Sequence, residues 1–275
     1  NYRGGVGVPA TKERHVLCLS GGKDSTALAV YLSDKIKDLE YLFCDTGKEL
    51  QETYEYLNKI EAILGINIVR LRADYSFDYF IDKYSGFLPS PQMRWCTREL
   101  KIVPFEKYCG EDTVHSYVGI RADENREGYI TQKPNIIPHF PFKEAGINKA
   151  MVLQILEDSG LGMPEYYKWR SRSGCYFCFF QRKVEWIGLK NTHPDLFEAA
   201  KQYEKESTPT GKRYTWSPKE SLNEIAAREE QIVKEYEKVQ SQSAKKLGNK
   251  SLVEIFDESM DELDEQGPGC LVCDL

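Results

Sequence analysis

The sequence predicts an α/β protein in which a doubly wound, mostly parallel sheet is followed by a helical C-terminal region. Short apolar segments alternate with segments of helical periodicity up to about residue 120, and this alternation places helices on both faces of a parallel sheet. Beyond about residue 125 a polar, proline-containing stretch leads into segments of helical pattern only. With 275 residues, 41% of them hydrophobic, the chain is large enough to bury a sizeable core.

The elements of the sheet region follow from apolar runs and helical spacing. We expect strands at 15–19, 40–44, 67–71 and 114–120, and helices at 26–32, 49–64, 76–84 and 97–108. Gly65 is expected to end the second helix, because glycine adopts the left-handed C-cap conformation without strain. Pro104 is expected to kink or restart the last helix, because it lacks the backbone N–H.

Three regions are predicted: a nucleotide-binding α/β core at 12–125, a helical region at 126–250, and an acidic tail at 251–275. The polar stretch 123–142 is expected to be a long loop with short extended pieces. Further helices are expected at 150–159, 183–189, 194–205 and 221–245.

Charge is distributed unevenly along the chain. The net charge of −6 argues against polyanion binding by the whole surface. The stretch 166–184 nevertheless has no acid and five bases, whereas 251–275 has eight acids and no base. These stretches are either solvated surface and a loose end, or a nucleic-acid surface that the tail covers. The five bases are Lys168, Arg170, Arg172, Arg182 and Lys183.

No apolar run approaches the roughly 20 residues needed to cross a bilayer, so no membrane association is expected. The chain starts with a polar, glycine-rich stretch rather than a secretory signal, and it contains eight cysteines. That combination indicates a reducing, cytoplasmic setting in which thiols serve as ligands or redox groups.

The most informative motif is Ser-Gly-Gly-Lys-Asp-Ser at 20–25, between a predicted strand and a predicted helix. Glycines let the backbone approach a ligand closely, and the N–H groups at a helix start favour an anion such as phosphate. Lys23 adds a cation, and Asp24 and Ser25 can cap the helix. An ordinary glycine-rich turn is the alternative interpretation.

Two further segments are expected beside this loop, because ligands bind beyond the carboxyl ends of parallel strands. They are Asp45-Thr46-Gly47 and Gly119-Ile120-Arg121, each at the end of a predicted strand. Asp45 and Thr46 could also simply cap the helix that follows.

Cysteine spacing leaves three interpretations open. Cys175 and Cys178 form a CxxC pair, and Cys270 and Cys273 repeat that spacing. Cys96, Cys175, Cys178 and one tail cysteine, Cys273 or alternatively Cys270, could hold a [4Fe–4S] cluster. The two CxxC pairs together could instead bind Zn²⁺, or the first pair could pack while the tail thiols are redox-active. Cys18 and Cys44 are expected to be core residues, and Cys109 to be structural.

Five segments follow one another along residues 15–190: 20–25, 45–47, Arg94-Trp95-Cys96-Thr97-Arg98-Glu99-Leu100-Lys101, Gly119-Ile120-Arg121-Ala122-Asp123-Glu124-Asn125-Arg126, and Gly174-Cys175-Tyr176-Phe177-Cys178. In this order they resemble the phosphoadenosine phosphosulfate (PAPS) reductase-like family of PP-loop ATP pyrophosphatases. They look most like the Dnd and Ssp branch that acts in bacterial DNA phosphorothioation. The resemblance implies the adenine nucleotide alpha hydrolase-like fold, with ATP and Mg²⁺ as cofactors.

The resemblance also implies roles for single residues. Lys23, Asp24 and Arg121 would be catalytic. Arg121 and Arg126 would contact phosphates, with Glu124 orienting one of them, and Asp45 and Thr46 would lie near the adenosine. The expected nucleotide-binding residues are Ser20, Gly21, Gly22, Lys23, Asp24, Ser25, Asp45, Thr46, Gly119, Arg121, Glu124 and Arg126. Related reductases carry a Cys-Cys pair where this chain has Trp95-Cys96, which makes the tail cysteines the candidates for a fourth cluster ligand.

The leading functional hypothesis is an ATP pyrophosphatase that adenylates a nucleic-acid group, expected to be the DNA backbone, for sulfur incorporation. A cysteine desulfurase and other phosphorothioation proteins would be its partners, and the basic segment 168–183 would contact DNA. The alternatives are a sulfonucleotide reductase that uses a tail thiol, and a nucleotide-binding scaffold within a sulfur-transfer complex.

Overall fold

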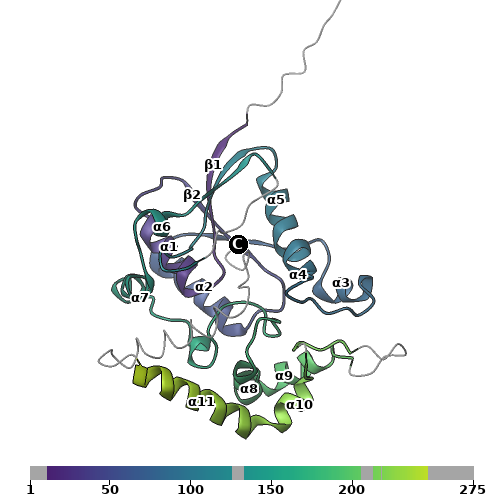
Figure 1. Ribbon diagram of the computed structural model, residues 1–275. Helices are drawn as coiled ribbons and strands as arrows, with labels where there is room; N and C mark the ends of the chain where they lie inside the picture. Colours follow the sequence, from purple (N-terminus) through teal and green to yellow (C-terminus); the bar gives the residue numbers. More distant parts are fainter. Residues whose placement is uncertain (1–10, 126–132, 206–212, 218, 247–275) are drawn as a thin grey trace, which may run out of the picture.

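The computed structural model describes residues 11–125, 133–205, 213–217 and 219–246. Its centre is a five-stranded, all-parallel sheet in the order β3-β2-β1-β4-β5 (Figure 1). The strands are β1 (Glu13–Cys18), β2 (Leu39–Cys44), β3 (Ile68–Leu71), β4 (Thr113–Tyr117) and β5 (Ile136–His139). The predicted α/β fold with a parallel sheet is confirmed.

Helices cover both faces of the sheet. Successive side chains of a strand point to opposite faces, so each strand contributes to two cores. Leu17 and Phe43 face a core formed with α1 (Lys23–Leu32), α2 (Gln51–Leu64) and α7 (Lys149–Asp158). Val16 and Leu42 face a second core, which contains Phe105 of α5 (Val103–Cys109). Figure 1 shows α5 on the opposite side of the sheet from α1 and α7. Cys18, Cys44 and Cys109 are buried in the second core, as predicted.

Helix ends follow the local sequence. Gly65 ends α2 at φ 64°, a left-handed conformation that glycine adopts without a Cβ clash. Ser76 caps α3 (Phe77–Lys83) by accepting a hydrogen bond from the Tyr79 N–H. α1 begins directly after Gly22, so the predicted phosphate loop leads into a helix as expected.

The segment expected to be one helix over 97–108 is three elements. A short turn, α4 (Trp95–Thr97), leads into a π-helix, η1 (Arg98–Ile102), and then into α5. Pro104 lies in the first turn of α5 and cannot donate to the Leu100 carbonyl four residues earlier. The regular helical ladder is therefore interrupted here, and π-turns of this kind are frequent at functional sites.

The sheet region extends beyond the predicted boundary at residue 125. β5 pairs in parallel with β4, and the short helix α6 (Pro141–Glu144) and α7 follow it. α7 packs on the same face as α1 and contributes Val152 and Leu156 to that core. The α/β core therefore continues to Asp158, the end of α7.

A helical region follows the sheet and gathers at one end of the molecule (Figure 1). It consists of η2 (Glu165–Lys168), a 3₁₀ helix, and α8 (Lys183–Thr192), α9 (Pro194–Lys201), α10 (Leu222–Ala227) and α11 (Glu229–Lys246). The single helix expected at 221–245 is interrupted at Arg228, which has φ −110° and ψ 21°. No described helix is long and apolar enough to cross a membrane. The acidic tail 251–275 lies outside the described residues.

Three histidines stack across β1, β4 and β5. His115 Nδ1 lies 2.8 Å from His139 Nε2, and the His15 and His115 ring centroids are 5.0 Å apart. Burial lowers the pKa of His139, and positive charge on His115 and His15 lowers it further, whereas Glu144 opposes the shift. Glu13 and Tyr117 also face the stack, because Glu13 lies 2.7 Å from His115 Nε2 and Tyr117 hydrogen-bonds His15.

Because the pKa of His139 is lower in the folded chain, neutral His139 stabilises the fold at neutral pH, and that contribution is lost as pH falls below about 6.5. We expect the free energy of unfolding in urea to decrease between about pH 7 and about pH 5. His139→Gln should flatten this dependence, whereas His193→Gln, outside the stack, should not. An unchanged pH profile in His139→Gln would show that acid destabilisation has another source.

Candidate active site

The loop Ser20–Ser25, which is predicted to bind phosphate and is called the phosphate loop below, lies where the strand order of the sheet reverses between β1 and β4. Residues 19–22 follow β1, and Gly119 to Arg121 follow β4, its neighbour in the middle of the sheet. Ligands of open α/β sheets bind at such switch points, beyond the carboxyl ends of the strands. The predicted meeting of the two segments is confirmed by contact, because Arg121 Nη1 lies 3.0 Å from Asp24 Oδ1.

Three glycines of this site lie where a side chain would be strained or crowded. Gly21 has φ +74°, which other residues rarely adopt. A Cβ on Gly22 would lie 2.8 Å from Ser173 Oγ, and a Cβ on Gly119 would lie 3.1 Å from backbone atoms of Asp24. The three glycines therefore permit close approach between the loop, α1 and the segment that contains Ser173.

Hydroxyl groups hold the loop in shape. Ser25 Oγ accepts from the Ser20 N–H at 3.1 Å, and Ser20 Oγ accepts from the Gly22 N–H at 3.3 Å. The Thr26 hydroxyl and N–H both donate to the Gly22 carbonyl, at 2.7 and 3.2 Å. These contacts fix the backbone before any ligand arrives, which is the preorganisation that an anion site needs.

Charged side chains of the site form a buried network. Lys23 Nζ lies 3.0 Å from Asp24 Oδ2, and Arg121 pairs with Asp24, Asp123 and Glu124 at 2.8 to 3.0 Å. Burial by itself would raise the pKa of Asp24, but the charges of Lys23 and Arg121 outweigh it and bring the pKa to about 2. Burial lowers the pKa of Lys23 and of Arg121, but their carboxylate partners raise both above their ordinary values. Lys23, Asp24 and Arg121 are therefore charged at neutral pH. Predicted Arg126 lies outside the described residues.

Side chains from the helical region complete the loop, and no motif in the sequence indicates their role. The Tyr166 hydroxyl donates to the Gly21 carbonyl at 2.6 Å, and the Tyr167 hydroxyl accepts from the Lys23 N–H at 3.2 Å. Ser173 donates to Ser20 Oγ at 3.1 Å. Their sequence separations from the loop exceed 140 residues, so no local pattern could reveal these contacts.

Asp45 and Thr46 lie at the same edge of the sheet, after β2. Asp45 is buried; its carboxylate accepts from the Gly47 N–H, the Tyr54 hydroxyl and the Arg72 guanidinium at 2.7 to 2.9 Å. Burial raises the pKa of Asp45, but these hydrogen bonds lower it overall. Asp45 thus holds the turn after β2, while the Thr46 hydroxyl donates to Glu49 Oε1 at 2.8 Å.

Cys175 lies close to this turn, and Cys178 lies near both Cys175 and Cys96. Its sulfur is 3.1 Å from Thr46 Oγ1 and 3.7 Å from Glu49 Oε1. Burial and the Glu49 charge raise the pKa of Cys175 well above its ordinary value. Burial, and then the nearby Cys178, raise the pKa of Cys96 to about 12.

The predicted metal ligands Cys96, Cys175 and Cys178 lie within the described residues, but the tail ligands do not. No set of three or more His, Cys, Asp or Glu side chains within the described ranges is arranged to hold a metal ion. Cys175 is engaged by Thr46 and Glu49, and the predicted tail ligands Cys270 and Cys273 lie outside the described residues. The predicted cluster and zinc sites each include a tail cysteine, so both stay predictions.

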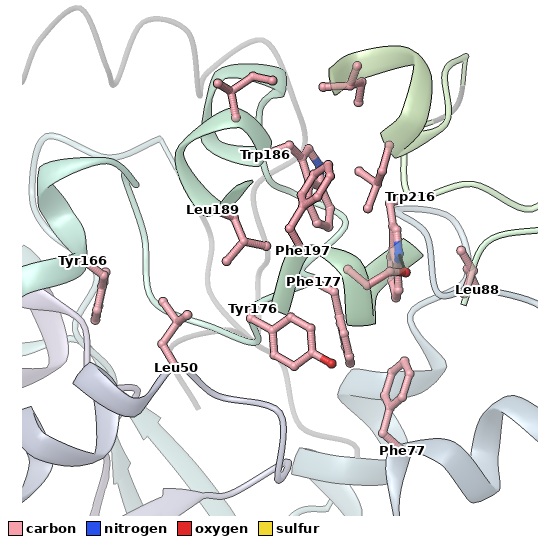
Figure 2. Close-up of a cluster of buried hydrophobic side chains, with 14 of the residues drawn as sticks. Leu50, Phe77, Leu88, Tyr166, Tyr176, Phe177, Trp186, Leu189, Phe197 and Trp216 are labelled. Carbon is pink, nitrogen blue, oxygen red and sulfur yellow. Dashed lines mark hydrogen bonds between the residues drawn. The ribbon is translucent and has the colours of Figure 1, made fainter. Parts of the chain in front are cut away.

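Aromatic residues between the two cysteines anchor the CxxC loop. Phe177 stacks on Trp216 with ring centroids 4.8 Å apart and lies 4.5 Å from the Phe77 ring. Figure 2 shows Tyr176 and Phe177 directed into the cluster that Trp186, Phe197 and Leu189 also form. The loop is thus fixed to the helical region, while Thr46 belongs to the sheet region.

The basic segment is largely paired within the protein. Arg170 is fully buried and donates to the carbonyls of Gly174 and Cys175, both at 2.9 Å. Arg182 pairs with Glu185 at 2.9 Å, and Lys183 pairs with Glu220. Arg170 therefore supports the CxxC loop from inside and is not presented to a nucleic acid. The remaining predicted contact residues are Lys168, which is exposed and paired with Glu165, and Arg172, which lies against the Phe180 ring.

Comparison with known proteins agrees with this geometry. Residues 14–135 match the family model described as the phosphoadenosine phosphosulfate reductase domain. This part of the chain is thus similar to PAPS reductase domains, and its parallel sheet and glycine-rich loop agree with that likeness.

The chain matches only part of each of two curated relatives. A protein of Methanocaldococcus jannaschii is 30% identical over 201 residues, 68% of this chain and 40% of that protein. A tRNA-specific 2-thiouridylase of Actinobacillus pleuropneumoniae is 24% identical over 184 residues, 54% of this chain and 47% of that enzyme. The chain thus spans less than half the length of these curated relatives.

Two solved structures resemble the chain at low identity. A phosphoadenylyl-sulfate reductase of Candida auris, solved as a phosphate complex, has 17% identity and a TM-score of 0.47, covering 59% of this chain and 81% of that one. A U34-tRNA thiolase of Methanococcus maripaludis, solved with its [4Fe–4S] cluster, has 18% identity and a TM-score of 0.40, covering 70% and 71%.

Proposed function

We propose that the chain is an ATP pyrophosphatase that transfers the AMP part of ATP to an oxygen of a nucleic acid, so that sulfur can replace that oxygen. The observation that carries the proposal is the loop Ser20–Ser25 at the start of α1, with Lys23, Asp24 and Arg121 converging on it at a sheet switch point. The sequence relationship to a tRNA thiouridylase supports the sulfur-transfer part of the proposal.

In the proposed reaction, an acceptor oxygen attacks the α-phosphorus of ATP, and the bond to the bridging oxygen of pyrophosphate breaks. The negative charge that builds on the leaving pyrophosphate is stabilised by loop N–H groups, by Lys23 and by Arg121. Mg²⁺ bound with ATP would supply further charge neutralisation. Asp24 keeps Lys23 and Arg121 charged and oriented, since it contacts both.

The acceptor we propose is the DNA backbone, on the basis of the sequence resemblance to phosphorothioation enzymes. A sulfur nucleophile delivered by a partner desulfurase would then displace AMP from the activated phosphate.

The test uses ATP labelled in the α-phosphate, with Mg²⁺ and either duplex DNA, tRNA or no acceptor. We expect labelled AMP and unlabelled pyrophosphate, with transient label on DNA. Formation of ADP and phosphate would show that the pyrophosphatase assignment is wrong. Label on tRNA but not on DNA would retain the adenylation and replace the acceptor.

A sulfonucleotide reductase is the second candidate, because the matching family model is that of a PAPS reductase domain. A reductase would release sulfite from PAPS in a thiol-dependent reaction, and Cys273→Ser would abolish that release.

A further inference from the structure

One stretch of the helical region lies directly on the phosphate loop. This stretch, residues 165–175 and called the strap below, comprises η2 and the chain leading to Cys175. Its Tyr166 and Ser173 hydroxyls donate to Gly21 O and Ser20 Oγ. Its third contact differs in kind, because the Tyr167 oxygen accepts a hydrogen bond from the loop.

The donor in that contact is the Lys23 N–H, at the first residue of α1. An N–H in the first turn of a helix has no partner within the helix. Together with the positive end of the helix dipole, it forms the anion-binding end of α1. In this structure the Tyr167 oxygen lies 3.2 Å from that nitrogen, in the position of an acceptor.

A phosphate oxygen would need the same place. N–H···O hydrogen bonds have donor–acceptor distances of about 2.9 Å along a nearly linear path, so two oxygens cannot both approach this N–H along that path. The Lys23 ammonium lies 5.7 Å from the centre of the Tyr167 ring, so the ring also stands beside the cation that would meet the phosphate.

The charged groups of the site are likewise held by the protein itself. Lys23 Nζ is bonded to Asp24 at 3.0 Å, and Arg121 is bonded to Asp24 and Glu124. These ion pairs hold the charged groups in place without an anion, and because an ammonium has three N–H donors and a guanidinium five, Lys23 and Arg121 can also reach a phosphate oxygen. The backbone N–H of Lys23 has a single hydrogen and must exchange its Tyr167 acceptor for a phosphate oxygen.

We infer that Tyr167 is a further residue of the nucleotide site, a placeholder whose hydroxyl occupies the phosphate position at Lys23 until nucleotide displaces it. The inference rests on the proposed binding of ATP at this loop. It deepens that proposal by making Tyr167, and with it this part of the strap, give up its contact with Lys23 when ATP enters.

The decisive variant is Tyr167→Phe, which removes the hydroxyl and keeps the ring packed on Tyr166, with centroids 5.0 Å apart. Since the competing hydrogen bond is lost, we expect Mg·ATP and pyrophosphate to bind about fivefold more tightly by titration calorimetry. Tyr166→Phe is the matched control. It removes a hydroxyl that supports the Gly21 carbonyl, so binding should not tighten.

A second measurement needs no variant. Amide hydrogen exchange of the wild-type protein should increase within 166–170 when saturating Mg·ATP is added, because the strap loses its contact with Lys23. A merely structural tyrosine would give the opposite result, since ligand binding would protect the segment.

The outcomes separate this inference from the proposed function. Unchanged or weaker binding in Tyr167→Phe, or protection of the strap by Mg·ATP, would overturn the placeholder role while ATP binding stands. Tighter binding without any pyrophosphate release would support the placeholder and contradict the pyrophosphatase. Failure of the wild-type protein to bind either ligand would overturn both.

Discussion

Lys23→Met is expected to lower the rate of AMP and pyrophosphate formation by about 100- to 1,000-fold, the usual cost of removing one preorganised group that stabilises transition-state charge. Lys23 is 8% exposed, and its ammonium is fixed by Asp24 at 3.0 Å. Its charge therefore acts from a position that water does not screen well. Methionine keeps the length and the apolar contacts of the side chain, and Asp24 keeps Arg121 as a partner, so we expect a loss of folding free energy smaller than that of Arg121→Gln beside the loss of rate.

The matched control for this variant is Lys107→Met. Lys107 pairs with Asp74 on the surface, where both side chains are more than two-thirds exposed. Exposed pairs contribute little, so activity and melting temperature should both remain close to wild type. Product release in Lys23→Met at the wild-type rate would place the chemistry away from this loop. The measurement is the initial rate of pyrophosphate release with saturating Mg·ATP.

Arg121→Gln is expected to reduce both stability and activity. The Arg121 side chain is 5% exposed and faces three carboxylates, those of Asp24, Asp123 and Glu124. Removing one partner from a buried ionic group leaves uncompensated charge, which costs about 3 to 5 kcal/mol of folding free energy. We also expect ATP turnover to be lost, because Asp24 no longer has its partner from the segment after β4. Urea unfolding and turnover assays measure the two effects.

Arg121→Lys separates charge from geometry. Lysine retains the positive charge but cannot bond several carboxylates through a planar fork. We therefore expect most of the stability to return, while turnover stays well below wild type. If Arg121→Lys restores turnover completely, Arg121 acts as a simple counter-charge, and its fork has no role in positioning.

The central elements could be predicted because their signals are local. The strand, glycine loop and helix around Ser20–Ser25 depend on adjacent residues, and the structure places them as expected. β5 was harder to predict, because Pro138 argues against a strand; the structure accommodates it at the edge of the sheet. The π-helix at Arg98–Ile102 has no periodic pattern that distinguishes it from an α-helix.

The site itself was predictable only in part. Lys23, Asp24, Arg121 and Glu124 belong to motifs that follow neighbouring strands, and the parallel topology brings them together. Tyr166, Tyr167 and Ser173 reach the loop from more than 140 residues away, through packing of the helical region. Arg170 illustrates the converse, because a cluster of bases in the sequence does not reveal which of them is buried.

The stacking of Phe177 on Trp216 connects the CxxC loop to the segment between α9 and α10. Ser173 and Cys175 lie just before Phe177 in the chain, and they contact Ser20 and Thr46 of the sheet region. We therefore expect a substitution at Trp216 to shift both contacts. The geometry of the proposed site thus depends on how the sheet region packs against the helical region, and we expect substitutions far from the Ser20–Ser25 loop to alter that geometry without changing any residue of the loop.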